Sequence, residues 1–172
     1  MLRIKNWGLC LVALALVAGT CLGQDAISPK FYKLDFVVKE VEGAKVLNAR
    51  AYSVVVTTDV VSTEQHPCSI RTISKVPMSN GSGGYGLYDL GVSVDCRSPR
   101  ETPGGLTLRV DADISSVPQE STTPSNYPPT VRQNKWTSSV VVPLRKPTVI
   151  FSSDDLTTKR QMQLELTATP IT

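Results

Sequence analysis

The sequence predicts an all-β fold: an antiparallel β-sandwich or open barrel of about eight strands that follows a signal peptide. Apolar and polar residues alternate with a period of two over most of the chain, which is typical of half-buried strands. Short turns and Gly- or Pro-rich loops separate these stretches, and no segment after residue 23 has a helical period. The length of 172 residues corresponds to about one domain.

The first 23 residues have the pattern of a secretory signal peptide. Two positive charges precede the apolar run Leu9–Ala18, and the small residues Gly19–Gly23 follow it. Ten apolar residues are too few to span a bilayer, which argues against a membrane anchor. Cys21 and Gly23 are small at the positions that the signal peptidase reads, so we expect cleavage after Gly23 and a single exported domain over residues 24–172. A second interpretation is a lipoprotein: the residues before Cys21 loosely resemble a lipobox, and lipidation of Cys21 would tether the chain to a membrane.

The N-terminal half of the domain contains four predicted strands. Their apolar residues alternate until Gly, Pro or a charged turn interrupts the pattern. The expected strands are Tyr32–Val38, Val46–Thr57, Ile70–Val76 (ending at Pro77) and Tyr88–Cys96. The turn Glu42–Lys45 and the glycine-rich loop Ser79–Gly86 lie between them.

The C-terminal half contains four more predicted strands. The clearest is Leu106–Ile114, where five apolar residues alternate with Thr, Arg and Asp, so that one face is buried and the other is solvated. After the Pro-rich loop Pro118–Thr130 come Trp136–Val142, Thr148–Phe151 and Gln161–Ala168, with Pro170 ending the last.

Two cysteines remain after the signal peptide, and an even number in an exported protein indicates a disulfide. If residues 68–77 and 87–96 form a hairpin in which Pro77 pairs with Leu87, then Cys68 also pairs with Cys96. We therefore expect a Cys68–Cys96 disulfide, with two buried free thiols as the alternative. Two cysteines and the distant His66 do not form a recognisable metal site.

Composition and charge exclude several functions. The formal net charge is +3, and the loss of Arg3 and Lys5 would leave 16 basic against 15 acidic residues, which excludes a strongly basic nucleic-acid binder. His66 is the single histidine and no nucleophile or acid can be assigned to it, so we expect no enzyme, cofactor or metal.

Other candidate sites have simpler explanations. Asp111 and Asp113 share one strand face beside Arg109, an arrangement that can serve a glycosidase or hold calcium but is more typical of a solvated surface. Asn80-Gly81-Ser82 matches a glycosylation sequon.

Five segments between Arg71 and Thr169 together resemble one known family. They are Ser74-Lys75-Val76-Pro77, Tyr88–Val94, Leu106–Val117, Pro129–Val142 and Pro147–Ile150. In this order they resemble the C-terminal β-domain of bacterial secretins, the ring-forming outer-membrane channels of type II and III secretion and of type IV pili. The chain departs from the family at Phe151-Ser152-Ser153, where secretins have two glycines, and in the short segment between Phe151 and Arg160.

The resemblance implies a structural or interaction protein in the envelope of a Gram-negative bacterium, in the periplasm or at the periphery of the outer membrane. Its partners would be envelope proteins or further copies of itself, added by pairing of edge strands, and not nucleic acid. Two alternatives stay open: a monomeric periplasmic module that binds a glycan or peptide, and a small outer-membrane barrel. Residues 30–59 match no family motif, and we expect a hairpin there that completes the sheet.

Overall fold

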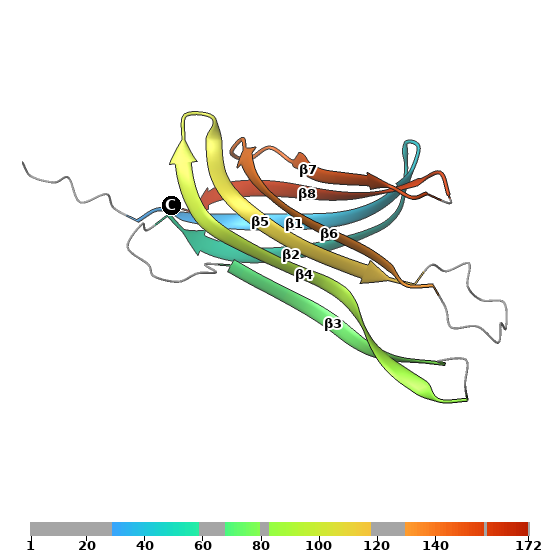
Figure 1. Cartoon of the computed structure of the whole chain (residues 1–172). Coiled ribbons are helices and arrows are strands. Elements are labelled where there is room, and N and C mark those ends of the chain that lie inside the picture. The colour runs from blue at the N-terminus through green and yellow to red at the C-terminus, as the bar shows by residue number, and fades with distance from the viewer. Residues whose placement is uncertain (1–28, 59–67, 80–82, 118–129, 157, 172) are drawn as a thin grey trace, which may run out of the picture.

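A computed structural model describes residues 29–58, 68–79, 83–117, 130–156 and 158–171, and it is all-β as predicted (Figure 1). These residues form two four-stranded antiparallel sheets and contain no helix long and apolar enough to span a membrane. The strands are β1 (Phe31–Glu42), β2 (Lys45–Thr57), β3 (Cys68–Ser79), β4 (Tyr85–Thr102), β5 (Gly105–Ser116), β6 (Arg132–Val142), β7 (Thr148–Asp154) and β8 (Arg160–Ile171).

The first sheet has the strand order β2-β1-β8-β7 and joins the two ends of the described chain. The hairpin predicted for residues 30–59 is present: β1 and β2 pair over their whole length, and Gly43 takes the positive φ of 59° that their tight turn needs. β1 also pairs with β8, with Phe31 opposite Ile171, so this hairpin does complete a sheet.

The second sheet has the order β3-β4-β5-β6, with each strand beside its neighbour in the sequence. The register of its first hairpin is the predicted one, because Pro77 lies opposite Leu87 and Cys68 lies opposite Cys96. A disulfide joins these two cysteines, whose Cα atoms are 5.1 Å apart.

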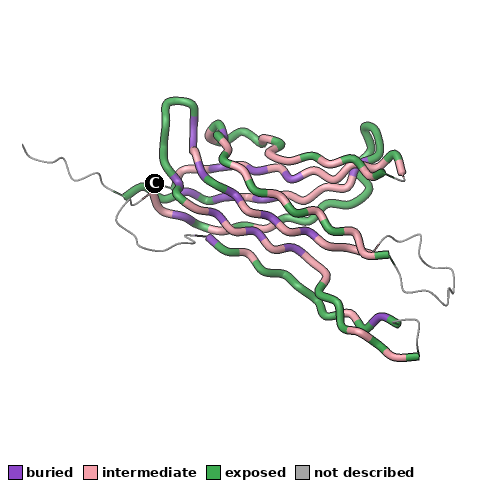
Figure 2. The backbone as a smooth tube through the Cα atoms, viewed as in Figure 1, coloured by how far each residue is buried: buried purple, intermediate pink, exposed green. Residues whose placement is uncertain are grey.

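The two sheets pack face to face and bury their alternating apolar residues between them (Figure 2). At one edge of the sandwich, the rings of Trp136 from β6 and Phe151 from β7 lie with centroids 5.5 Å apart. The fully buried side chains with the largest volumes come from both sheets: Tyr32, Phe36, Leu34, Leu106, Leu108, Leu164 and Leu166.

Two prolines expected to end strands lie inside them, and this part of the prediction was wrong. Pro77 lies within β3, which is an edge strand of the second sheet. Pro170 lies within β8, opposite Tyr32 of β1, beyond the point where β7 stops pairing with β8. A proline costs no ladder hydrogen bond on the open side of a strand, so both positions tolerate it.

Four features expected from the sequence fall outside the described residues. They are the signal peptide with Cys21, the segment with His66, the sequon at Asn80 and nearly all of the Pro118–Thr130 loop.

Candidate interaction surface

The far ends of β3 and β4 form a two-stranded ribbon that leaves the body of the sandwich (Figure 1). We call this ribbon the hairpin extension; it consists of Ser74–Ser79 and Tyr85–Leu90. β5 runs beside β4 only as far as the pair of Gly91 with Ser115. Along Tyr85–Leu90, β4 therefore has β3 on one side and no described strand on the other.

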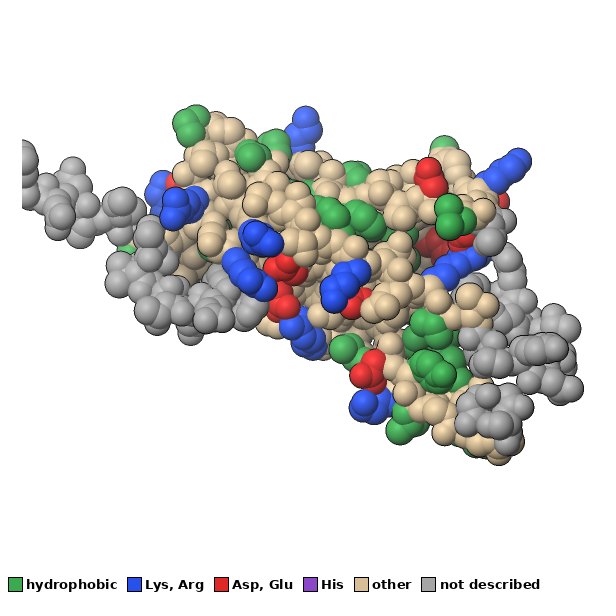
Figure 3. All heavy atoms as spheres, viewed as in Figure 1, with side chains coloured by type: hydrophobic (Ala, Val, Ile, Leu, Met, Phe, Trp, Pro, Cys, Tyr) green, Lys and Arg blue, Asp and Glu red, His purple; other side chains and the backbone are tan. Residues whose placement is uncertain are grey.

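Apolar side chains lie on both faces of the hairpin extension, and the exposed ion pair of Lys75 with Asp89 (2.9 Å) lies beside them. On one face Pro77 lies opposite Leu87, and on the other Val76 lies opposite Tyr88. The exposed fraction is 79% for Tyr85, 69% for Leu87 and 41% for Tyr88. Hydrophobic side chains gather on this ribbon in Figure 3. An exposed apolar patch on a protruding element is typical of an interaction site.

The base of the hairpin extension depends on Gly91. This residue has a φ of 150°, and a Cβ there would lie 1.9 Å from the carbonyl oxygen of Thr72. No other residue type fits so close an approach of two strands. The hydroxyl of Ser115 accepts a hydrogen bond from the Gly91 amide and donates one to the carbonyl oxygen of Asp89, both at 3.1 Å.

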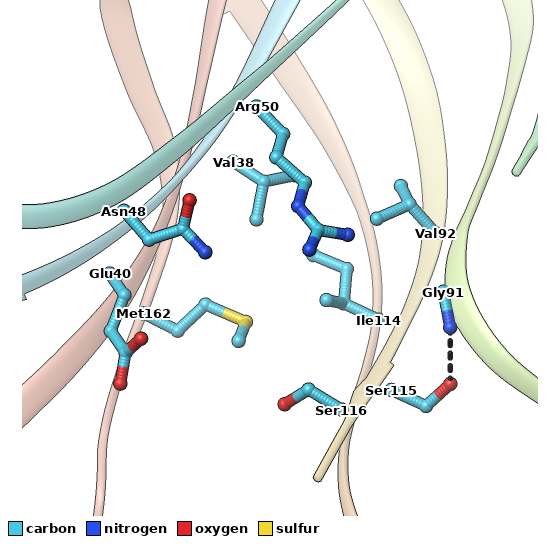
Figure 4. Close-up of a pocket in the computed structure, with 10 residues that line it drawn as sticks. All are labelled: Val38, Glu40, Asn48, Arg50, Gly91, Val92, Ile114, Ser115, Ser116 and Met162. Carbon is cyan, nitrogen blue, oxygen red and sulfur yellow. Dashed lines mark hydrogen bonds between the residues drawn. The ribbon is translucent and has the colours of Figure 1, made fainter. Parts of the chain in front are cut away.

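A cleft of about 100 Å³ opens between the two sheets beside this base (Figure 4). Val38 and Met162 from the first sheet and Val92 and Ile114 from the second give it an apolar lining. The guanidinium group of Arg50, from β2, points into the cleft. It is the one cation among the described residues that line this space.

The inward-facing positions of the first sheet change from apolar to polar toward this cleft. In β1 the inward series runs from the buried Phe36 through Val38 to Glu40, and in β2 it runs from Tyr52 to Arg50. These residues were not predicted as a site from the sequence. The signal was present, because the alternation that places Phe36 inside also places Glu40 and Arg50 on the same face.

At the opposite end, a polar cluster connects the two sheets. Lys30, which precedes β1, pairs with Glu101 of β4, and Tyr32 donates a hydrogen bond to the same carboxylate. The hydrogen bond from Lys30 is the main cause that lowers the pKa of Glu101, and burial is the main cause that raises the pKa of Tyr32. This cluster connects the sheets at the end away from the cleft.

The predicted acidic pair lies on the solvated outer face of the second sheet. Asp111 accepts a hydrogen bond from Thr137 at 2.6 Å and lies 3.2 Å from a guanidinium nitrogen of Arg97. Asp113 accepts hydrogen bonds from Gln133 at 2.9 and 3.0 Å. Each carboxylate is thus engaged across strands. The described residues include no group of three or more His, Cys, Asp or Glu side chains that could hold a metal ion.

No protein-family model matches the chain, and no curated protein matches it. Among solved structures, the chain is similar to the Salmonella SPI-1 type III secretion injectisome secretin InvG (10% identity, TM-score 0.43), covering 84% of this chain and 64% of that one. It is also similar to the type II secretin GspD of enteropathogenic Escherichia coli (10% identity, TM-score 0.41), covering 84% and 66%. The chain thus spans just under two thirds of each. These structures are secretins, the family that the sequence motifs resemble, but similarity at this level assigns no role to any residue here.

Proposed function

We propose that this chain is a non-enzymatic structural protein of the bacterial cell envelope, a secretin-like β-module that assembles with further copies of itself. The observation that carries the proposal is the hairpin extension, with exposed apolar side chains on both faces and a backbone edge along Tyr85–Leu90 that pairs with no other described strand. Such an edge accepts an added strand through main-chain hydrogen bonds, while the apolar side chains supply contact area.

The segments that carry the resemblance to secretins also build this part of the molecule. Ser74-Lys75-Val76-Pro77 lies in the extension, and Tyr88–Val94 runs from the extension into the sheet. A role in a secretion or pilus assembly follows from the resemblance and is part of the proposal.

The test is the native mass of the protein, measured by light scattering after expression of the full chain in a Gram-negative host and purification without detergent. We expect one uniform oligomer, far above the 18.6 kDa of the chain. A monomer at all concentrations would overturn assembly through the extension.

A matched pair of variants locates the interface. Leu87→Ser removes an apolar side chain from the extension, and Leu156→Ser removes an equally large one, 102% exposed, from outside it. We expect Leu87→Ser to lower the native mass while Leu156→Ser leaves it unchanged. Equal effects would show that the extension is not the contact.

A second candidate function is a monomeric module that binds a peptide, and the cleft at Arg50 is the observation that favours it. A monomeric mass together with ligand binding at the cleft would support this alternative.

A further inference from the structure

We infer that the cleft between the sheets binds the C-terminal residue of a protein chain, with its carboxylate on Arg50 and its aliphatic side chain against the apolar lining. This inference rests on the second candidate function, whose ligand it names, and not on assembly through the hairpin extension.

The charge of the cleft favours a carboxylate. Arg50 makes no hydrogen bond or ion pair with another described residue. Glu40 also lines the cleft, but a guanidinium nitrogen of Arg160 lies 3.4 Å from its carboxylate, which in Figure 4 points away from Arg50. Arg50 is therefore the unmatched charge, and a guanidinium group binds a planar anion with two parallel hydrogen bonds.

The size and lining of the cleft favour a small aliphatic group next to that carboxylate. The cleft, with a volume of about 100 Å³, has room for an aliphatic side chain. Val38 and Met162 on one side and Val92 and Ile114 on the other offer apolar contacts. The last residue of a protein chain carries both groups, because its free carboxylate and its side chain are attached to the same Cα atom.

The remaining polar groups suit the peptide backbone. The hydroxyl of Ser115 is already occupied by its two hydrogen bonds at the base of the extension. Ser116 and Asn48 direct their polar atoms toward the space in Figure 4, where they can bond to the peptide backbone. The ligand would thus meet the exposed guanidinium group of Arg50 with its charged end and these polar side chains with its backbone.

The test uses three pentapeptides, each acetylated at the N-terminus, and titrates them into the full-length protein by calorimetry. The first ends in valine with a free carboxylate, the second ends in valine amide, and the third carries an internal aspartate and ends in an amide. We expect the first to bind with a Kd of about 0.1–1 mM and the other two to bind at least about tenfold more weakly.

Variants then assign the binding to the cleft. We expect Arg50→Gln to weaken binding of the free-acid peptide about tenfold. We expect Asn48→Trp, which adds a large side chain to the lining of the cleft, to abolish binding. Arg109→Gln removes an exposed arginine from the outer face of β5 and serves as the matched control, with no change expected.

Three results would overturn the inference: equal binding of the acid and amide peptides, equal loss in Arg50→Gln and Arg109→Gln, or no binding of the free acid at millimolar concentration. Displacement of the peptide by an equal concentration of inorganic phosphate would also overturn it, since it would identify a general anion site. These binding readouts do not depend on the native mass. A change of mass in Leu87→Ser therefore tests the assembly and not the cleft.

Discussion

The Ser115 hydroxyl accepts a hydrogen bond from the Gly91 amide at 3.1 Å, at the point where β5 stops running beside β4. Past this point β4 continues with β3 alone. The pair therefore marks the boundary between the four-stranded sheet and the hairpin extension, and it lies beside the cleft.

Gly91→Ala should be severely destabilising. The new Cβ would meet the Thr72 carbonyl oxygen at 1.9 Å in a backbone conformation that side chains disfavour, so we expect a loss of about 3 kcal/mol in the free energy of unfolding. Gly43→Ala is the control for backbone conformation alone, because nothing lies within 4 Å of its Cβ, and it should lose about 1 kcal/mol. Urea unfolding of both variants measures this difference, and equal losses would contradict the close approach.

The Cys68–Cys96 disulfide should stabilise the folded state by about 3–4 kcal/mol, because it closes a loop between residues 28 apart in the sequence. The Cys68→Ala/Cys96→Ala double variant, compared with the oxidised protein by urea unfolding, gives this value. Alkylation without reduction should add no mass at either cysteine. Alkylation of both Cys68 and Cys96 in the purified protein would show that the bond does not form.

The pair of Ser53 with Asp35 should make stability depend on pH. The hydrogen bond from the Ser53 hydroxyl is the main cause that lowers the pKa of Asp35, and Lys33 adds to it. A lowered folded pKa means that this contribution is present above the unfolded pKa of about 3.9 and is lost as the pH falls through the folded value.

We therefore expect Ser53→Ala to lose about 0.5 kcal/mol at pH 7 and clearly less at pH 2.5, since the side chain of Asp35 is close to a third exposed. Ser139→Ala, an exposed serine in β6, is the control and should show no such pH dependence. A deficit that is constant across this range would contradict the assignment.

The contact of Trp136 with Phe151 should couple the two sheets. A tilted ring pair at 5.5 Å contributes about 1 kcal/mol beyond the burial of each ring. A double-mutant cycle with Trp136→Leu and Phe151→Leu should give a coupling energy of this size. If the losses in unfolding free energy are additive, the two rings are not in contact and do not couple the sheets at this edge.

The fold was accessible from the sequence because strand alternation and loop composition are local signals. The same is true of the register between Cys68 and Cys96, which follows from counting along one hairpin. The prolines at 77 and 170 were misjudged because their tolerance depends on which side of a strand is open, a property of the whole sheet.

The hairpin extension and the cleft were harder to predict from the sequence, because they too depend on the arrangement of whole sheets. Nothing in residues 85–90 by themselves indicates that β5 ends at Ser116 and leaves them unpaired. Arg50 lies on an inward face by alternation, but its placement in a cleft depends on how the two sheets diverge. Contacts between strands distant in sequence set both features.

The position of the disulfide has a mechanical consequence. It fastens β3 to β4 at one end of the hairpin, while the extension occupies the other end. The hydrogen bonds between antiparallel strands are perpendicular to the strands. A pull on the tip along the hairpin axis would therefore load the bonds between β4 and β5 in shear, while the disulfide keeps β3 fastened to β4.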